Sequence, residues 1–543
     1  MLFRSQVAPG LAVTPARAVL EALQQRHEIA LLDVREEDPY AQCHPLYAAN
    51  LPLSRLEAEV YTRVPRRDTQ VVVYDDGEGW AQIAVRRLQA LGYVQVSLLE
   101  GGLQGWFDAG GELFQDVNTP SKAFGEWVES IRHTPSLSAP EVQALIASGT
   151  DMVVLDARRW DEYQTMNIPT GVSVPGAELV LRARAMAPNP QTRIVVNCAG
   201  RTRSIIGTQS LVNAGIPNPV VALRNGTIGW TLAGQRLETG ADRRFKDITP
   251  EQLSQAQSDA RRVADRAGVA RIDRAQLQRW CAQAHRTTYV CDVRTPEEYL
   301  SGHWPGSLST QGGQLVQETD HTAAVRGARF VLIDPLQVRA DMSASWLAQM
   351  GWEVAVLEGV TQADLTETGT EQRLRPPVSG DFIEATQLAI WLSQGDTWVV
   401  DLSSAVQFIR GHIPEALGMM RATLSFDVLR GLTQRAAAPK RVVLTCADGV
   451  ASAHAQSDLR QALTLAQVKA SVHGLVGGNA AWRTSGQSLV QGEKGWVAER
   501  IDRYRRPYEG TANPHAAMQA YLDWEFGLVE QLKRDGTHHF QVI

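Results

Sequence analysis

The feature that most constrains the fold of this chain is a repeated spacing between short apolar segments. Four apolar segments end in an aspartate, and a second apolar segment follows each of them at a nearly constant distance. The residue after the second segment comes 42 positions after the aspartate in three repeats and 45 in the fourth; the pairs are Asp33 and Asp75, Asp156 and Cys198, Asp292 and Asp334, and Asp401 and Cys446. Matching intervals of this length predict four copies of one supersecondary unit.

Each copy shows the same order of predicted elements. Continuous apolar runs rich in β-branched residues, such as 153–155 and 194–196, predict buried strands, whereas 205–212 has apolar residues at helical spacing. A Gly-rich turn follows in every copy and carries a tryptophan in three of them, at Trp106, Trp230 and Trp482. Strands alternating with helices predict an α/β fold: four tandem domains, each a small parallel sheet flanked by helices on both faces.

The domain organisation follows from these repeats, because 543 residues are too many for one hydrophobic core. We expect domains at 1–120, 130–245, 268–372 and 380–492, and a helical tail at 493–543. Residues 251–271 are expected to form a connecting helix, and Pro376-Pro377 marks a boundary. Residues 516–533 predict a helix that packs against a domain and serves as a structural clasp.

Composition excludes several classes of function. The net charge is −6, and no basic block with interleaved aromatic residues indicates a nucleic-acid partner. No apolar run approaches the ~20 residues of a membrane span, and the first residues lack a secretory signal, so a cytoplasmic location is expected. The five cysteines are scattered and have no metal-ligand spacing, so we expect neither disulfides nor a metal site, and no cofactor.

The second copy carries the segment that indicates chemistry: Cys198, Ala199, Gly200, Arg201, Thr202, Arg203 and Ser204 follow a predicted strand and lead into a helix. Parallel α/β folds place ligands at this end of their strands. Backbone N–H groups of such a loop, together with the helix N-terminus, attract an anion. With two arginines nearby, this environment is expected to lower the pKa of Cys198 and to bind an anionic sulfur donor.

This loop, together with the Asp-ending strand and the Gly-Trp turn, resembles the rhodanese (sulfurtransferase) family over most of the chain. The resemblance implies that Cys198 takes a sulfane sulfur from a donor as a persulfide and passes it to a nucleophile such as cyanide or a thiol. It implies that the backbone of 199–203 cradles the sulfur and that Arg201 and Arg203 bind anions. Asp156 and Arg158 would brace the loop, with Ser204 in support, and copy one would cover copy two.

The other copies depart from this pattern. Asp75 and Asp334 stand where the thiol belongs, so copies one and three cannot form a persulfide and are expected to be inactive. Copy four keeps Cys446 as a second candidate site. There Ala451 replaces the loop arginine and Asp448 adds negative charge, which makes an anionic donor less welcome.

The remaining thiols and two histidines have simpler interpretations. We expect Cys43, Cys281 and Cys291 to be small core residues, as free cysteines usually are. His303 and His412 lie in Gly-His-x-Pro segments and are expected to cap loops.

The leading hypothesis is a thiosulfate or persulfide sulfurtransferase that acts on small sulfur donor and acceptor anions or thiols through Cys198. A second hypothesis is a sulfur-relay or interaction scaffold that carries the persulfide to a protein acceptor. A phosphatase is disfavoured, because only four residues separate Cys198 from Arg203, and the related phosphatases use a loop one residue longer.

Overall fold

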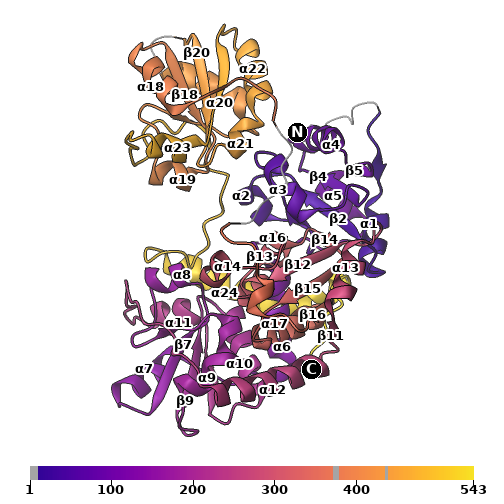
Figure 1. Cartoon of the computed structure of the whole chain (residues 1–543), viewed down its shortest axis with the longest axis vertical. Helices are drawn as coiled ribbons and strands as arrows, with labels where there is room; N and C mark the ends of the chain where they lie inside the picture. Colours follow the sequence, from indigo (N-terminus) through magenta and orange to yellow (C-terminus); the bar gives the residue numbers. More distant parts are fainter. Residues whose placement is uncertain (1–9, 371–377, 435–437) are drawn as a thin grey trace.

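The computed structural model describes residues 10–370, 378–434 and 438–543. Four α/β units follow one another along the chain (Figure 1). The Pro376-Pro377 boundary and the start of the chain lie outside the described residues. Within the described residues, no helix is long and apolar enough to cross a bilayer.

The sheet of copy two has the strand order β6, β10, β9, β7, β8, and every neighbouring pair is parallel; the strands are β6 (Ser136–Leu137), β10 (Val220–Leu223), β9 (Arg193–Asn197), β7 (Met152–Asp156) and β8 (Val172–Ser173). The central strand β9 is buried on both faces, as its run of apolar residues requires.

The other three sheets repeat this order and are parallel among their own strands. Copy one has β1 (Val13–Thr14), β5 (Val96–Leu99), β4 (Gln70–Tyr74), β2 (Ile29–Asp33) and β3 (Ala49–Asn50). Copy three has β11 (Ala270–Ile272), β16 (Glu353–Leu357), β15 (Arg329–Ile333), β12 (Thr288–Asp292) and β13 (Leu308–Ser309). Copy four has β17 (Phe382–Ile383), β21 (Ser471–Leu475), β20 (Arg441–Thr445), β18 (Thr397–Asp401) and β19 (Leu417–Gly418). The predicted fold class is confirmed.

Helices connect the strands in each copy. Copy one contains α1 (Ala16–Gln24), α2 (Glu37–Gln42), α3 (Leu56–Arg63), α4 (Trp80–Ala90) and α5 (Gly102–Asp108). Copy two contains α7 (Ala139–Ala147), α8 (Trp160–Thr165), α9 (Leu179–Met186), α10 (Thr202–Ala214) and α11 (Gly226–Leu232). Copy three contains α13 (Arg274–Cys281), α14 (Pro296–Ser301), α15 (Gly312–Gln317), α16 (Thr319–Thr322) and α17 (Val338–Gln349). Copy four contains α18 (Ala385–Ser393), α19 (Ala405–Arg410), α20 (Leu424–Gln434), α21 (Val450–Ala453), α22 (Gln456–Leu465) and α23 (Gly478–Thr484).

Three further helices lie between or after the copies: α6 (Thr119–Arg132), α12 (Pro250–Arg266) and α24 (His515–Asp535). The α12 helix packs against α9 of copy two and α17 of copy three, so it joins these copies. The tail helix α24 packs against α6 and α11. Its residues Met518, Tyr521 and Leu522 share an apolar cluster with Ile228 of copy two.

Copy one joins copy three rather than copy two. Strand β14 (Val325–Arg326) of copy three adds to the sheet of copy one by antiparallel pairing with β2, and the two copies share one apolar core. The expectation that copy one itself covers copy two is therefore wrong. The helix α6, which follows copy one, packs on α10 of copy two instead.

Copy four stands apart from the other three in Figure 1. It contacts copy one through a buried ion pair, in which Arg421 donates to both carboxylate oxygens of Glu57, at 2.6 and 2.8 Å. Arg87 of copy one also donates to Asp458 of copy four, at 2.9 Å. From copy four the tail returns to the body of the molecule, where α24 lies (Figure 1). The last part of the chain therefore reaches copy two.

Candidate active site at Cys198

Cys198 lies directly after β9, at the start of the loop that leads into α10. Its side chain is buried, and its Sγ donates to Ser204 Oγ at 3.4 Å. The carbonyl groups of Cys198 and Ala199 accept hydrogen bonds from the backbone N–H groups of Thr227 and Ile228, both at 3.0 Å. These bonds fasten the loop to the start of α11.

Gly226 shows why the Gly-rich turn is needed beside this loop. Its φ is +52°, and a Cβ atom there would lie 2.3 Å from the carbonyl oxygen of Cys198. Both the backbone conformation and the close approach require glycine. The turn and the cysteine loop therefore form one unit, and the buried Trp230 anchors it by donating to the carbonyl of Arg236 at 2.9 Å.

Asp156 and Arg158 form a buried pair beneath the loop. The Arg158 guanidinium donates to the two carboxylate oxygens of Asp156 at 2.9 and 2.7 Å, and to the Met166 carbonyl. Asn197, the residue before Cys198, donates to Asp156 at 2.9 Å. This geometry fits the bracing role that the sequence predicts for the pair.

Arg203 is held by a carboxylate of its own copy. Both of its terminal nitrogens donate to Glu162, at 2.7 and 2.8 Å. Burial alone would raise the pKa of Glu162, but Arg203, with Arg158 and Arg159, outweighs it and holds that pKa at about 2. Arg203 also acts on Cys198, since its charge favours the thiolate.

Arg201 turns toward α6 and the tail. It donates to Glu126 at 2.6 and 2.8 Å, to Glu129, and to Asn225 at 3.0 Å. Its guanidinium lies 4.3 Å from the ring centroid of Phe526. The sequence predicts Arg201 as an anion-binding residue, but in the structure its donors are engaged by carboxylates.

The tail and α6 cover the loop. A Cβ atom on Gly200 would lie 3.1 Å from Tyr521 Cε1 and 3.3 Å from Glu525 Oε2, so α24 lies directly against the loop backbone. Tyr521 donates its hydroxyl to Glu525 Oε1 at 2.8 Å. The sequence predicts a structural role for the tail, with Tyr521 among its packing residues, and does not indicate Glu525. Their spacing of one helical turn shows that they share a face, but not what that face contacts.

The pKa of Cys198 is raised, contrary to the expectation from the sequence. Burial of the sulfur is the largest cause; Arg203 and Ser204 act in the opposite direction, and Glu525 adds to the rise. The sequence shows the positive charges near Cys198. It does not show how completely the thiol is removed from water or that a carboxyl group from the tail lies nearby.

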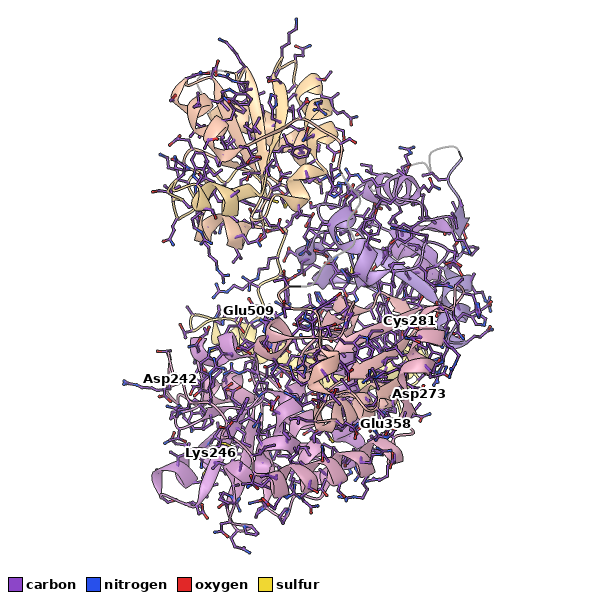
Figure 2. The ribbon with its side chains drawn as sticks, viewed as in Figure 1. Asp242, Lys246, Asp273, Cys281, Glu358 and Glu509 are labelled. Carbon is purple, nitrogen blue, oxygen red and sulfur yellow. The ribbon has the colours of Figure 1, made fainter. Side chains whose placement is uncertain are left out.

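A cavity of about 420 Å³ borders the site and is strongly basic. Seven arginines and four carboxylates are among its lining residues, which come from copies two, three and four, from the tail and, through Asn118, from the start of α6. Figure 2 shows Glu509 on the tail segment that contributes to this lining. The cavity includes Arg203 and Tyr508, so it reaches the surroundings of the Cys198 loop. Arg410 of copy four has no carboxylate partner among the described residues, and Arg505 donates to the Ala512 carbonyl at 3.1 Å.

In copies one and three an aspartate occupies the place of the thiol and bonds to its own loop. Asp75 accepts from the backbone N–H groups of Gly77 at 3.1 Å and Ala81 at 2.9 Å. Asp334 accepts from the backbone N–H of Arg339 at 2.9 Å and from its guanidinium at 2.9 Å. A carboxylate thus takes the position of an anion that the loop would otherwise bind.

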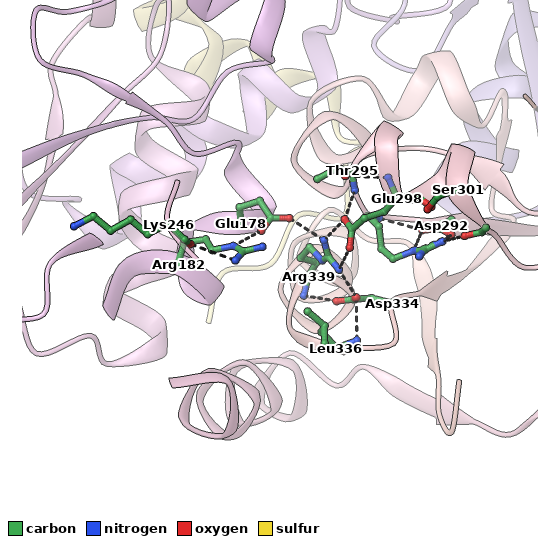
Figure 3. A network of polar contacts seen from close by, with 12 residues as sticks. Glu178, Arg182, Lys246, Asp292, Thr295, Glu298, Ser301, Asp334, Leu336 and Arg339 are labelled. Atoms are coloured by element: carbon green, nitrogen blue, oxygen red, sulfur yellow. Dashed lines mark hydrogen bonds and ion pairs between the residues drawn. The ribbon is translucent and has the colours of Figure 1, made fainter. Parts of the chain in front are cut away.

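The Asp334 network also joins two copies. Arg339 donates to Glu298 of copy three at 2.6 and 3.1 Å and to Glu178 of copy two at 2.9 Å (Figure 3). All of these atoms except part of Glu298 are buried. Copy three therefore uses its loop as a structural contact with copy two.

Cys446 of copy four is buried and lies 3.5 Å from Asp448 Oδ1, to which its Sγ donates. Burial raises its pKa most, Ser452 lowers it, and Asp448 raises it. No arginine is among the causes. The thiol form is favoured here, as it is at Cys198.

The three remaining cysteines differ in burial. Cys291 is buried and Cys43 is partly buried. Cys281 is exposed at the surface of copy three, so the expectation of a core residue is wrong for it (Figure 2). Its helix buries mainly Leu277 and leaves its last residue in solvent. No cluster of three metal-ligating side chains occurs in the part of the chain that the structure describes.

Both histidines in the Gly-His-x-Pro segments cap the preceding helix. His303 Nδ1 lies 2.9 Å from the carbonyl oxygen of Tyr299, and His412 Nδ1 lies 2.8 Å from that of Phe408. Each ring also stacks on the aromatic side chain of the same residue. The sequence predicts that these histidines cap loops, whereas the structure shows both rings bound to carbonyl groups of the preceding helices.

The class of this protein follows from its parallel sheets, its buried cysteine loop and its Gly-Trp turn, which together are typical of rhodanese-like domains. Comparisons with known proteins agree with this class. The model of the rhodanese-like domain matches residues 16–109, 138–233 and 384–485, and the chain belongs to this family. The third copy lies outside these matches, although its sheet has the same strand order.

One solved structure is similar over nearly the whole chain. It is described as a thiosulfate sulfurtransferase from Pseudomonas aeruginosa, with 59% sequence identity and a TM-score of 0.94. The match covers 98% of this chain and 100% of that chain. A protein named thiosulfate sulfurtransferase from Azotobacter vinelandii is 26% identical over 215 residues, which are 36% of this chain and 78% of the relative.

Proposed function

We propose that this protein is a sulfurtransferase that moves sulfane sulfur from thiosulfate or a persulfide to a small thiophilic acceptor, through a persulfide on Cys198. The observation that carries the proposal is the position of Cys198. It is the buried thiol at the carboxyl end of β9, with Ser204 and Arg203 as its polar neighbours. The high identity to a protein described as a thiosulfate sulfurtransferase supports the choice of donor.

The chemistry proceeds in two steps that balance. The Cys198 thiolate attacks the sulfane sulfur of thiosulfate, the S–S bond of the donor breaks, and sulfite leaves with the electron pair. An acceptor then attacks the outer sulfur of the Cys198 persulfide, and Cys198 leaves as the thiolate. No external oxidant or reductant is needed.

The basic cavity provides a route for anionic donors. Seven arginines against four carboxylates leave a positive balance in its lining, and Arg203 lies both in this lining and beside the loop. Cationic walls concentrate anions near a site and speed their association. We infer that donors reach Cys198 from this cavity.

Small acceptors fit the site better than a protein thiol. Cys198 is 2% exposed and is covered by α6 and α24, so a partner protein would have to displace the tail helix to reach it. For this reason we place the sulfur-relay scaffold second. We infer a cytoplasmic location, in which the free thiols stay reduced.

The test is a turnover assay with thiosulfate as the donor and cyanide as the acceptor. The wild type should form thiocyanate, and Cys198→Ala should form none. Cys446→Ala is the matched control and should retain the wild-type rate. Full activity of Cys198→Ala would overturn the proposal.

A further inference from the structure

The tail helix α24 places the carboxyl group of Glu525 against the loop that follows Cys198. Glu525 is fully buried, and its Oε2 faces Gly200, at 3.3 Å from where a Cβ atom on that glycine would lie. Among the described residues, Oε2 has no hydrogen-bond partner. A buried oxygen without a partner is unfavourable, so its retention beside the cysteine loop needs an explanation.

The surroundings hold this carboxyl group in place while leaving one oxygen unoccupied. Tyr521 donates to Oε1 at 2.8 Å and so holds one oxygen of the carboxyl group. The charged groups of α6 that act on Glu525 are Glu126 and Lys122, and Arg201 acts on it from the loop. Glu126 is bound to Arg201, and Lys122 forms an ion pair with Asp116 at 2.9 Å.

Glu525 can exchange a proton near neutral pH. Burial, reinforced by Glu126, raises its pKa to about 8, although Lys122, Tyr521 and Arg201 act to lower it. Tyr508 and Asp116 face Tyr521 and act on it electrostatically. A base with a pKa near the operating pH is effective in general base catalysis.

Glu525 acts on Cys198 as well as on the loop backbone, since its charge raises the pKa of the thiol. The Cys198 sulfur already donates to Ser204 Oγ at 3.4 Å, at the start of α10. Glu525 Oε2 instead faces the loop backbone at Gly200, from the helix that covers it. The oxygen without a hydrogen-bond partner is therefore directed at the loop that carries Cys198.

We propose that the acceptor is a small neutral thiol and that Glu525 is the base that takes its proton during transfer. This inference rests on the proposed function. The Glu525 carboxylate accepts the thiol proton, and the resulting thiolate attacks the outer sulfur of the Cys198 persulfide. The persulfide S–S bond breaks, its electron pair goes to Cys198, and the acceptor leaves as a new persulfide.

The test separates acceptors that carry a proton from those that do not. The Cys198 persulfide is formed with thiosulfate on the full chain, the donor is removed, and 2-mercaptoethanol or sulfite is added near pH 8. Intact mass follows the loss of ~32 Da, one sulfur atom. Sulfite has little proton to lose at this pH and needs no base.

The variant Glu525→Gln keeps the size of the side chain and its bond to Tyr521 but cannot take a proton. We expect transfer to 2-mercaptoethanol to slow by about 10²- to 10⁴-fold, the usual range for a lost general base. Transfer to sulfite should be equal or faster, because a negative charge near the anion is removed. Equal slowing with both acceptors, or no slowing with the thiol, would overturn the proposal.

Two further variants guard against a structural effect. Glu530→Gln, an exposed position on the same helix that pairs with Lys533, should transfer sulfur to both acceptors like the wild type.

Tyr521→Phe removes the hydrogen bond that favours the Glu525 carboxylate, so its pH profile with the thiol should shift to higher pH while the sulfite profile stays unchanged. An unchanged thiol profile would contradict the proposal. Failure of the wild type to form the persulfide at all would count against the proposed function instead.

Discussion

Both carboxylate oxygens of Glu162 accept hydrogen bonds from the Arg203 guanidinium, at 2.7 and 2.8 Å. Arg203, whose charge lowers the pKa of Cys198, is therefore also paired with a carboxylate. This pairing explains why Arg203 lowers the pKa of Cys198 without overcoming burial.

Replacing Glu162 and replacing Arg203 should shift the pH dependence of persulfide formation in opposite directions. Glu162→Gln leaves the charge of Arg203 uncompensated, so the Cys198 thiolate should form at lower pH than in the wild type. Arg203→Gln removes the favourable charge, so the thiolate should require higher pH. The rate of persulfide formation from thiosulfate across pH 6–10 measures both shifts, and shifts in the same direction would contradict the account.

The basic cavity should act on donor binding rather than on the chemical step. Replacing Arg410 or Arg505 by alanine removes positive charge from its lining, so KM for thiosulfate should rise while kcat stays near the wild-type value. The salt dependence of kcat/KM should become weaker in both variants. Arg279→Ala on copy three is the control, because among the described residues Arg279 bonds only to Gln276 of its own helix. A KM that is unchanged in both cavity variants would rule out this route.

Copy three should lose stability when the carboxylate of Asp334, which stands in the place of the thiol, is removed. Asp334→Ala leaves the buried Arg339 without one of its carboxylate partners, and breaking a buried ion pair costs about 3–5 kcal/mol. Asp75→Ala removes an acceptor for the backbone N–H groups of Gly77 and Ala81 and should cost about 1 kcal/mol. Urea denaturation of the full chain measures both losses. A loss for Asp334→Ala no larger than that for Asp75→Ala would contradict the structural role of this loop.

Because the pKa of Glu525 is raised in the folded chain, the free energy of unfolding should depend on pH. Between the ordinary glutamate pKa and its folded value of about 8, the folded chain binds more protons than the unfolded chain. The contribution of this group to stability therefore falls as pH rises through that interval. Glu525→Gln does not titrate, so its melting temperature relative to the wild type should rise between pH 6 and pH 8.5. A constant difference would mean that Glu525 does not titrate in this range.

The fold was accessible from the sequence because its signal is local and repeated. In each copy the first long strand ends in an aspartate, and the interval from Asp156, the last residue of β7, to Cys198 contains α8, β8, α9 and β9. The position of the cysteine loop follows from the same pattern. No such pattern records how the copies pack, and the addition of β14 to the sheet of copy one depends on contacts between distant segments.

The surroundings of Cys198 could be predicted only in part, because they also depend on contacts between distant segments. Arg201 and Arg203 were identified from the loop, but their partners could not be, since Glu126 lies 75 positions before Arg201 and comes from another helix. Glu525 approaches Gly200 from the far end of the chain. Charge near a thiol can be predicted from neighbours in sequence, whereas its burial and its opposing charges depend on tertiary packing.

The most direct test of the central claim is the intact mass of the full chain after incubation with thiosulfate. The wild type and Cys446→Ala should each gain ~32 Da, one persulfide sulfur, and lose it when cyanide is added. Cys198→Ala should gain nothing. A gain that survives in Cys198→Ala and disappears in Cys446→Ala would place the reactive sulfur in copy four and contradict the account.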